Sequence, residues 1–401
     1  MDTMWRKNLL PIITSVFLFV SSLIIGKNAE DSLIRDLIII SAIAVDMKDE
    51  DEDFLVTVQA INAPSVKDSA SEKLGFVLYQ ESGRTITEAL QKIQKSFSRY
   101  LFMDDLEVIL ISEEIAKKRG IADVVNYLFL EQTISSNTML FVSKETSAHD
   151  ILAMFTPFHK VSSKRIVDTI ENIKEYSSFA FPVFPNRVKN FLLNYPVVNN
   201  VIPYISIAGD VEVGLKKENI EAYQPKSKME INGMSYFKKD KLIDFLSLEE
   251  SKNLLFLMDN VREGSLEVSC PEGPGYFSYQ YKKSKTSFKV DWTGDSPQIG
   301  IKVKTNGRII ESTCKTSFEH PNMDLFRKQI RNQLEDSITN LIHKSQAENL
   351  DYIGFAKELY ISKPSKWRDI EGEWASVFPT IPFDLKADVS IQRSGDAISL
   401  D

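Results

Sequence analysis

The sequence predicts an α+β protein in which an amino-terminal membrane-anchor helix precedes a multidomain ectodomain of mixed sheets with packed helices. An uncharged apolar run occupies residues 9–26 and is flanked by basic residues. The whole chain is 43% hydrophobic and 26% charged, which is enough apolar material for folded cores. Strand-like and helix-like stretches alternate after the run. Because a body of this size exceeds what one core usually supports, we expect two or three domains.

The apolar run predicts a membrane contact. Arg6 and Lys7 precede Leu9 to Gly26, and Lys27 closes the run. A helix of this length covers about 27 Å, just short of a hydrocarbon core of roughly 30 Å. The run is long for the core of a cleaved signal peptide, and no good small-x-small cleavage site follows it. Residues 1–27 are therefore a signal or anchor segment, and the basic flank places the rest of the chain on the outer face.

The first expected domain, residues 28–195, is a mixed sheet covered by helices. Residues 37–46 and 54–62 are rich in β-branched side chains and predict a hairpin. Thr85 and Glu88 form a capping box, and the helix that it opens has apolar residues at helical spacing. Further strands and helices then alternate, which predicts helices packed on a sheet. We expect strands at 106–112 and 138–143, and helices at 113–119, 121–130, 162–176 and 186–194. Gly120 ends the first of these helices.

Two more domains are expected after the prolines between residues 180 and 203, which indicate a boundary. The second, residues 200–285, is a strand-rich α+β domain, and the third, residues 286–401, is a sheet with a long helix at 323–346. Strands are expected at 204–213, 229–237, 242–246, 276–281, 287–292, 299–311 and 381–391, and a helix at 247–258. The long helix has one narrow apolar stripe, which favours packing on a sheet of its own domain over an intermolecular coiled coil.

The two cysteines, Cys270 and Cys314, leave two states open. They could form one disulfide in an oxidising compartment, or they could be two buried free thiols on strands, which is the state that we favour. The four histidines are scattered, without the spacing of a metal site, so we expect no metal and no cofactor.

Composition and motifs argue against an enzyme and against nucleic-acid binding. The net charge of −8 and the pI near 5.3 do not suit a polyanionic partner. The sequence has no nucleophile elbow, no P-loop and no dinucleotide fingerprint, so we assign no catalytic residue. Aromatic residues gather late in the chain, and we favour core and interface packing for them over a contact surface. They are Tyr352, Phe355, Tyr360, Trp367, Trp374 and Phe378.

Four blocks of the chain, in order and at similar spacing, resemble one known family. They are Leu37–Asp46 (LIIISAIAVD), Gly83–Leu90 (GRTITEAL) with Leu106–Ser112 (LEVILIS), Ile231–Leu242 (INGMSYFKKDKL), and Asp351–Phe355 (DYIGF) with Pro364, Trp367 and Trp374. These blocks are similar to those of the Ger(x)C proteins, the C subunits of spore nutrient-germinant receptors.

The resemblance implies a lipoprotein-like, non-enzymatic subunit of the spore inner membrane, with a three-domain α+β ectodomain on the outer face. It also implies two membrane partners, the A-type and B-type subunits of the receptor. The family normally has a lipobox cysteine after the apolar run. Here Lys27 and Asn28 stand in that region, and no cysteine is available for lipid attachment. We therefore expect the apolar run to remain uncleaved and to replace the lipid as anchor.

The function predicted from the sequence is a membrane-anchored accessory C subunit of a germinant receptor that acts through protein–protein contacts in spore germination. The alternative is a membrane-anchored solute-binding protein of a transporter, although no internal duplication supports two lobes around a ligand. An anchored hydrolase of the spore cortex is a further rival. The binding surface stays unassigned.

Overall fold

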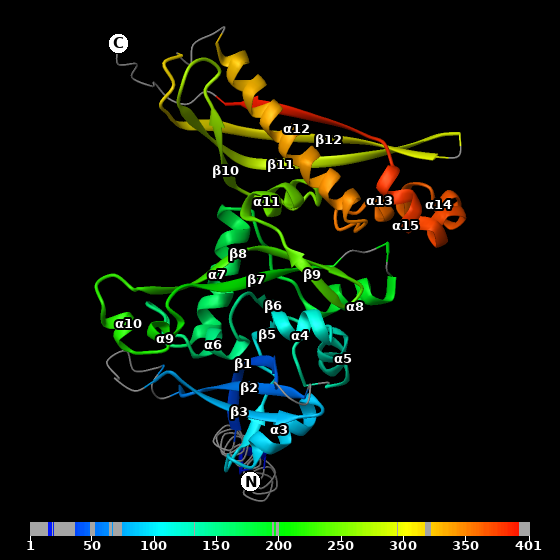
Figure 1. Ribbon diagram of the computed structural model, residues 1–401. Helices are drawn as coiled ribbons and strands as arrows, with labels where there is room; N and C mark the ends of the chain where they lie inside the picture. The colour runs from blue at the N-terminus through cyan, green and yellow to red at the C-terminus, as the bar shows by residue number, and fades with distance from the viewer. Residues whose placement is uncertain are drawn as a thin grey trace, which may run out of the picture.

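The computed structural model describes residues 15–17, 19, 37–48, 53–63, 66, 74–131, 133–194, 196–197, 200–294, 296–316 and 322–392. Within these ranges the chain forms two sheets with helices packed on them (Figure 1). The predicted α+β class with mixed sheets and packed helices is confirmed.

The larger sheet begins with an antiparallel meander. Strand β1 (Leu37–Met47) pairs with β2 (Phe54–Ile61), and β2 pairs with β3 (Phe76–Gly83). In this register Ile43 lies opposite Val58, so β-branched side chains pack across the pair. The predicted hairpin is confirmed.

The centre of the larger sheet is parallel. Strand β1 pairs in parallel with β5 (Val108–Ser112), β5 with β6 (Met139–Ser143), and β6 with β7 (Val201–Gly209). The short β4 (Tyr100–Phe102) also pairs in parallel with β1. All residues of β5 and β6 are buried, as expected for strands covered on both faces. Antiparallel β8 (Ser227–Lys238) and β9 (Lys241–Phe245) complete the order β3-β2-β1-β5-β6-β7-β8-β9.

Helices cover both faces of this sheet. Figure 1 shows α6 (Ala148–Ala153) and α7 (Ser162–Tyr176) on one side, and α4 (Glu113–Lys118) and α5 (Ala122–Leu130) on the other. The remaining helices around it are α3 (Ile86–Gln94), α8 (Pro185–Asn194), α9 (Val211–Gly214) and α10 (Glu218–Glu221).

Local signals in the sequence determine where several of these helices begin and end. The Thr85 hydroxyl accepts from the Glu88 N–H at 3.1 Å, as the capping box predicts. The Glu88 carboxylate, however, accepts from the N–H of Arg84 rather than from that of Thr85. Gly120 ends α4 with φ +89°, and its N–H donates to the carbonyl of Ile115 at 2.7 Å.

The smaller sheet has the order β10-β11-β12-β13. Strands β10 (Gly264–Ser269), β11 (Tyr276–Thr293) and β12 (Ser296–Ser312) form an antiparallel meander, and β13 (Phe383–Ile391) adds in parallel to β12. Helix α12 (Met323–Ala347) lies along this sheet (Figure 1), and its apolar stripe, including Phe326, Ile330 and Leu334, is fully buried. Packing of the long helix within the chain, which the sequence favoured, is therefore what the structure shows.

Shorter helices connect and cover the second sheet. Helix α11 (Leu248–Leu257) precedes β10 and contacts α12. Between α12 and β13 lie α13 (Phe355–Ser362), α14 (Pro364–Ile370), the 3₁₀ turn η1 (Glu371–Glu373), α15 (Trp374–Val377) and the 3₁₀ turn η2 (Phe378–Thr380).

The predicted boundaries do not coincide with a change of sheet. The boundary at 195–200 falls inside the larger sheet, because β6 pairs with β7 through Val142 and Tyr204. The boundary at 285–286 falls inside β11, a single strand where the sequence predicts two. The change of sheet lies instead between β9 and β10, around α11. Of the prolines, Pro182 and Pro196 flank α8, Pro185 begins it, and Pro203 lies within β7, so they do not mark a break between sheets.

The predicted anchor, Leu9 to Gly26, lies outside the described residues except for Ser15–Phe17 and Phe19, which are helical. Among the helices in the described ranges, none is both long enough and apolar enough to cross a membrane.

Candidate functional site

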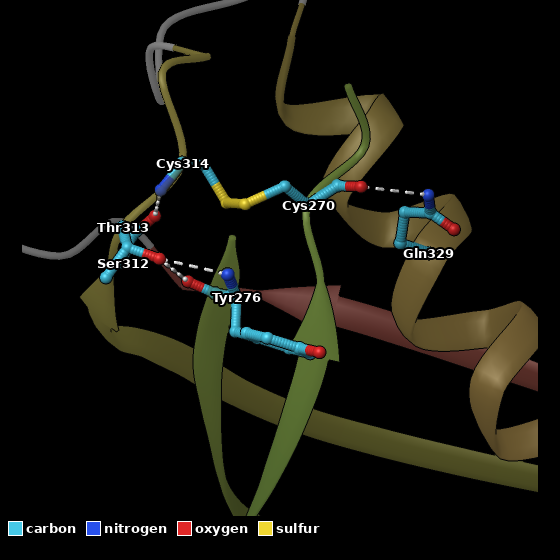
Figure 2. Close-up of a disulfide and its surroundings, with 6 residues drawn as sticks. All are labelled: Cys270, Tyr276, Ser312, Thr313, Cys314 and Gln329. Carbon is cyan, nitrogen blue, oxygen red and sulfur yellow. Dashed lines mark hydrogen bonds between the residues drawn. A yellow bond between two sulfur atoms is a disulfide. The ribbon is translucent and has the colours of Figure 1, made fainter. Parts of the chain in front are cut away.

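A disulfide joins the two cysteines of the chain (Figure 2). Cys270 follows β10, Cys314 follows β12, and their Cα atoms are 5.5 Å apart. The favoured prediction of two free thiols is therefore wrong. The chain positions are 44 residues apart, and the meander brings them together because β10 and β12 both flank β11.

Hydrogen bonds hold the segments on both sides of the disulfide. The Gln329 side chain on α12 donates to the carbonyl of Cys270 at 3.4 Å, and the Cys314 N–H donates to the Ser312 hydroxyl at 3.0 Å (Figure 2). The Thr313 hydroxyl exchanges bonds with the backbone of Tyr276 at 3.0 and 3.1 Å. The disulfide therefore connects the β10–β11 turn to the segment after β12, beside the long helix α12. Such a bond persists in an oxidising compartment.

A cleft of about 710 Å³ lies at the carboxyl ends of the parallel strands β1, β5 and β6. Asp46 comes from the end of β1, Ser112 from the end of β5, and Glu145 from the segment after β6. This edge of an open α/β sheet is where ligands most often bind. His149, on α6, also lines the cleft.

Asp46 is the most strongly perturbed group in the cleft. Its side chain is buried and accepts from the N–H groups of Ala148 and His149 at 2.8 and 2.9 Å, so it caps α6. Burial raises the pKa of Asp46 to about 6, against the opposite effect of these two hydrogen bonds. Burial also lowers the pKa of His149, whose Nδ1 lies 3.1 Å from the Thr57 hydroxyl. The neutral form of the imidazole is favoured.

Most hydroxyl and carboxylate groups of the cleft are engaged in structural contacts, whereas the buried Thr146 hydroxyl has no hydrogen-bond partner among the described residues. The hydroxyls of Ser112 and Ser147 accept from the N–H groups three residues later, at 3.3 and 2.9 Å, and so act as helix caps. Glu113 pairs with Lys117 at 2.6 Å and accepts from the Glu145 N–H at 3.0 Å. These contacts serve folding, and they do not form the nucleophile–base arrangement of a covalent catalyst.

Over the ranges that the structure covers, no group of three or more His, Cys, Asp or Glu residues is arranged to hold a metal ion. Three residues were predicted to set the membrane topology, and they lie outside the described residues: Arg6, Lys7 and Lys27. Asn28, which stands in the region where the family has its lipidated cysteine, also lies outside them. The sequence did not single out Asp46 or His149. One sequence feature could have indicated Asp46 as a cleft residue: it is an acidic residue at the end of an apolar strand-like run.

The late aromatic residues are mostly buried, in agreement with the packing that the sequence favoured. Trp367 and Trp374 are 1% and 5% exposed, and their ring centroids are 5.1 Å apart. Phe355 and Phe378 are also buried, whereas Tyr360 is half exposed.

Comparison with known proteins matches nearly the whole chain. The family described as the spore germination protein N-terminal domain matches residues 31–207, and the family described as spore germination B3/GerAC like, C-terminal, matches residues 232–395. The chain is 25% identical over 401 residues to spore germination protein KC of Bacillus subtilis (strain 168), covering 98% of this chain and 97% of that protein. It is 22% identical over 384 residues to spore germination protein GerQC of Bacillus cereus, covering 95% and 98%.

The fold is similar to the crystal structure of the GerBC protein. The TM-score is 0.58 at 19% sequence identity, and the match covers 88% of this chain and 97% of that one. This similarity concerns the arrangement of the elements.

Proposed function

Because the chain belongs to the Ger(x)C, or GerAC-like, family of spore germination proteins, we propose that it is a membrane-anchored accessory C subunit of a nutrient-germinant receptor. The observation that carries this proposal is the order of the two family matches, residues 31–207 and 232–395, over nearly the full length of the relatives. Names of relatives alone would not carry it, since one fold can serve several functions.

The subunit would act through protein–protein contacts rather than by catalysis. Its partners would be the A-type and B-type membrane subunits of the receptor. In support of this, Ser112 and Ser147 in the large cleft act as helix caps, and Glu113 is held in an ion pair with Lys117. The domain organisation remains a prediction, with residues 28–195, 200–285 and 286–401 as the proposed units.

The proposed location is the spore inner membrane, with the folded body on the outer face. The basic flank before the apolar run supports this orientation. The disulfide between Cys270 and Cys314 supports it independently, because structural disulfides are rare in a reducing cytoplasm. With no cysteine at Lys27 or Asn28, Leu9 to Gly26 would serve as an uncleaved anchor.

The assembly is tested by purifying an affinity-tagged chain from detergent-solubilised spore membranes and identifying the proteins that accompany it. We expect the A-type and B-type subunits of the receptor. Recovery of an ABC permease instead would favour the solute-binding alternative. A matched control carries the tag on an unrelated anchored spore protein, and A-type or B-type subunits in that control would invalidate the result.

The anchor is tested on the same material. Amino-terminal sequencing should show that the mature protein begins at or near Met1. Alkaline extraction should leave the protein in the membrane fraction. A processed chain that appears in the soluble fraction would refute the anchor while leaving the assembly result intact.

A further inference from the structure

The loop between α3 and β4 lies beside the start of β1, where the chain enters the folded body. Tyr100, the first residue of β4, is the register partner of Leu37, the first residue of β1. Figure 1 shows the start of β1 and α3 at the end of the molecule opposite the second sheet. The segment that precedes Leu37 therefore joins the body next to this loop.

The distance between the predicted anchor and this loop is limited by the chain itself. The anchor ends at Gly26, and residues 27–36 connect it to Leu37. A segment of this length spans at most about 36 Å when fully extended. It has two basic and three acidic residues, so the segment itself is not attracted to an anionic surface. The part of the body nearest to the membrane is therefore the surface around Leu37.

The end of α3 and the loop after it carry positive charge. Residues 89–103 include Lys92, Lys95 and Arg99 and no acidic residue, in a chain of net charge −8. Lys92 pairs with Glu88 at 3.1 Å. The side chains of Lys95 and Arg99, in contrast, are exposed and have no partner among the described residues. Two positive charges are therefore available to an anionic partner.

Side-chain contacts hold the loop in one shape. The Gln94 side chain donates to the carbonyl of Arg99 at 2.8 Å and accepts from the N–H of Leu101 at 3.1 Å. The Phe97 ring packs on Tyr79 of β3, with 4.2 Å between the ring centroids. The loop is therefore ordered before it meets a partner, and contact with a flat surface costs little further entropy.

An exposed aromatic side chain adds a second feature of a membrane-contact surface. Tyr100 follows Arg99 in the sequence and is 64% exposed. Tyrosine is enriched at the membrane–water interface, because its ring is apolar and its hydroxyl is polar. Asp104 and Asp105 are exposed as well, but they follow β4, which pairs with β1 in the direction away from Leu37. The tip of the loop is therefore basic and aromatic.

We propose that the surface formed by Lys95, Arg99 and Tyr100 rests on the anionic lipid headgroups of the membrane in which the chain is anchored. The inference rests on the anchor of the proposed function and adds the face of the body that meets the bilayer. Each basic residue near an anionic membrane favours the contact about fivefold, so Lys95 and Arg99 together favour it about 25-fold. The second sheet then lies on the side away from the membrane, since it is at the opposite end of the molecule (Figure 1).

The test is fluorescence quenching in lipid nanodiscs that hold the full chain. A fluorophore is attached at Ser98→Cys, an exposed position of the loop, since the two native cysteines are joined in a disulfide and do not react. The quencher is a spin label on the lipid headgroup. We expect stronger quenching in discs with phosphatidylglycerol than in discs of phosphatidylcholine alone. The difference should vanish at 1 M salt, where the Debye length falls to about 3 Å.

Matched variants separate the contact from the tether. Lys95→Gln/Arg99→Gln should reduce the ratio of docked to undocked chain about 25-fold in anionic discs. Lys283→Gln/Lys304→Gln removes the same charge from exposed positions of β11 and β12 and should leave the ratio unchanged. A fluorophore at Ser287→Cys, an exposed position of β11, should not be quenched by the headgroup label.

Several results would overturn the proposal. One is equal quenching at position 98 in the two kinds of disc, and another is an unchanged ratio in the Lys95/Arg99 variant. Stronger quenching at position 287 than at position 98 would show that the opposite end faces the bilayer. A chain recovered outside the discs would refute the anchor and the contact together, whereas an incorporated chain without quenching would refute the contact alone. The assembly with A-type and B-type subunits is measured separately, so its result does not depend on this test.

Discussion

The disulfide between Cys270 and Cys314 should be a major contributor to the stability of the second sheet. It closes a loop between positions 44 residues apart. Removing the loop-closure entropy of such a loop from the unfolded chain stabilises the folded state by about 4 kcal/mol. The double variant Cys270→Ser/Cys314→Ser should lose a similar amount, because the serine hydroxyls replace the sulfur atoms without the covalent bond.

The measurement is urea denaturation of the full chain, followed by the fluorescence of its tryptophans. With a slope of about 2 kcal/mol/M, the transition of the second sheet should move down by about 2 M. Reductant should shift the transition of the wild type in the same direction and leave the double variant unchanged. A chain with two sheets can unfold in more than one transition. The transition of the second sheet is the one whose midpoint moves when reductant is added.

Two results would refute this reasoning. One is titration of two free thiols in the unreduced, unfolded wild type, which would mean that the bond is absent. The other is an unchanged midpoint on reduction, which would mean that the unfolded chain gains no freedom when the loop opens.

Further predictions concern buried and capping groups. Gln59→Leu should cost about 3 kcal/mol in urea denaturation. Its buried amide bonds to Ser41, the Leu152 carbonyl and Ser162 at 3.2, 3.2 and 2.6 Å, and these three bonds would be lost. The Leu152 carbonyl would keep the Ser162 hydroxyl as donor, but the Ser163 N–H would lose the Gln59 oxygen at 3.3 Å. An unchanged midpoint would contradict this. The pKa of Asp46 is raised from 3.8 to about 6, so the folded state binds a proton at Asp46 more tightly than the unfolded state does. The stabilisation of the folded state by this proton is lost as the pH rises from about 4 to 6. Relative to Asp46→Asn, the wild type should lose up to about 3 kcal/mol over that range, and parallel pH profiles would refute the shift. Ser247→Ala should destabilise the protein by about 1 kcal/mol, because Ser247 and Glu250 form a complete capping box on α11. The measurement is thermal unfolding, and an unchanged transition temperature would refute the prediction.

Local structure could be predicted where the signal is local. The period of apolar residues predicted α7 at residues 162–176, and the structure has this helix with the same bounds. The prediction for α12 ended one residue before the observed end at Ala347. Thr85 and Gly120 marked helix ends for the same reason, because the groups that they bond to lie within a few residues of them.

The sequence-based prediction missed elements, or misplaced their ends, where tertiary contacts rather than the local sequence pattern decide the secondary structure. β3 has an amphipathic sequence with exposed residues, and it is a strand because β2 provides its hydrogen-bond partners. The sequence predicts a strand to residue 213, but β7 ends at Gly209, where Asp210 caps the short helix α9. The expected break at 195–200 is bridged by the pairing of β6 with β7, which a composition shift cannot reveal.

The sequence by itself determined the α+β class, most helices, the family and the expectation of an amino-terminal anchor. These follow from periodicity, from composition and from blocks of residues in order. Tertiary structure alone decided that Cys270 is bonded to Cys314, that Asp46 is buried at the head of α6, and that Tyr100 lies beside Leu37 at the start of β1. Each of these depends on groups far apart in the chain, and their approach is decided by strand pairing and core packing that no local pattern encodes.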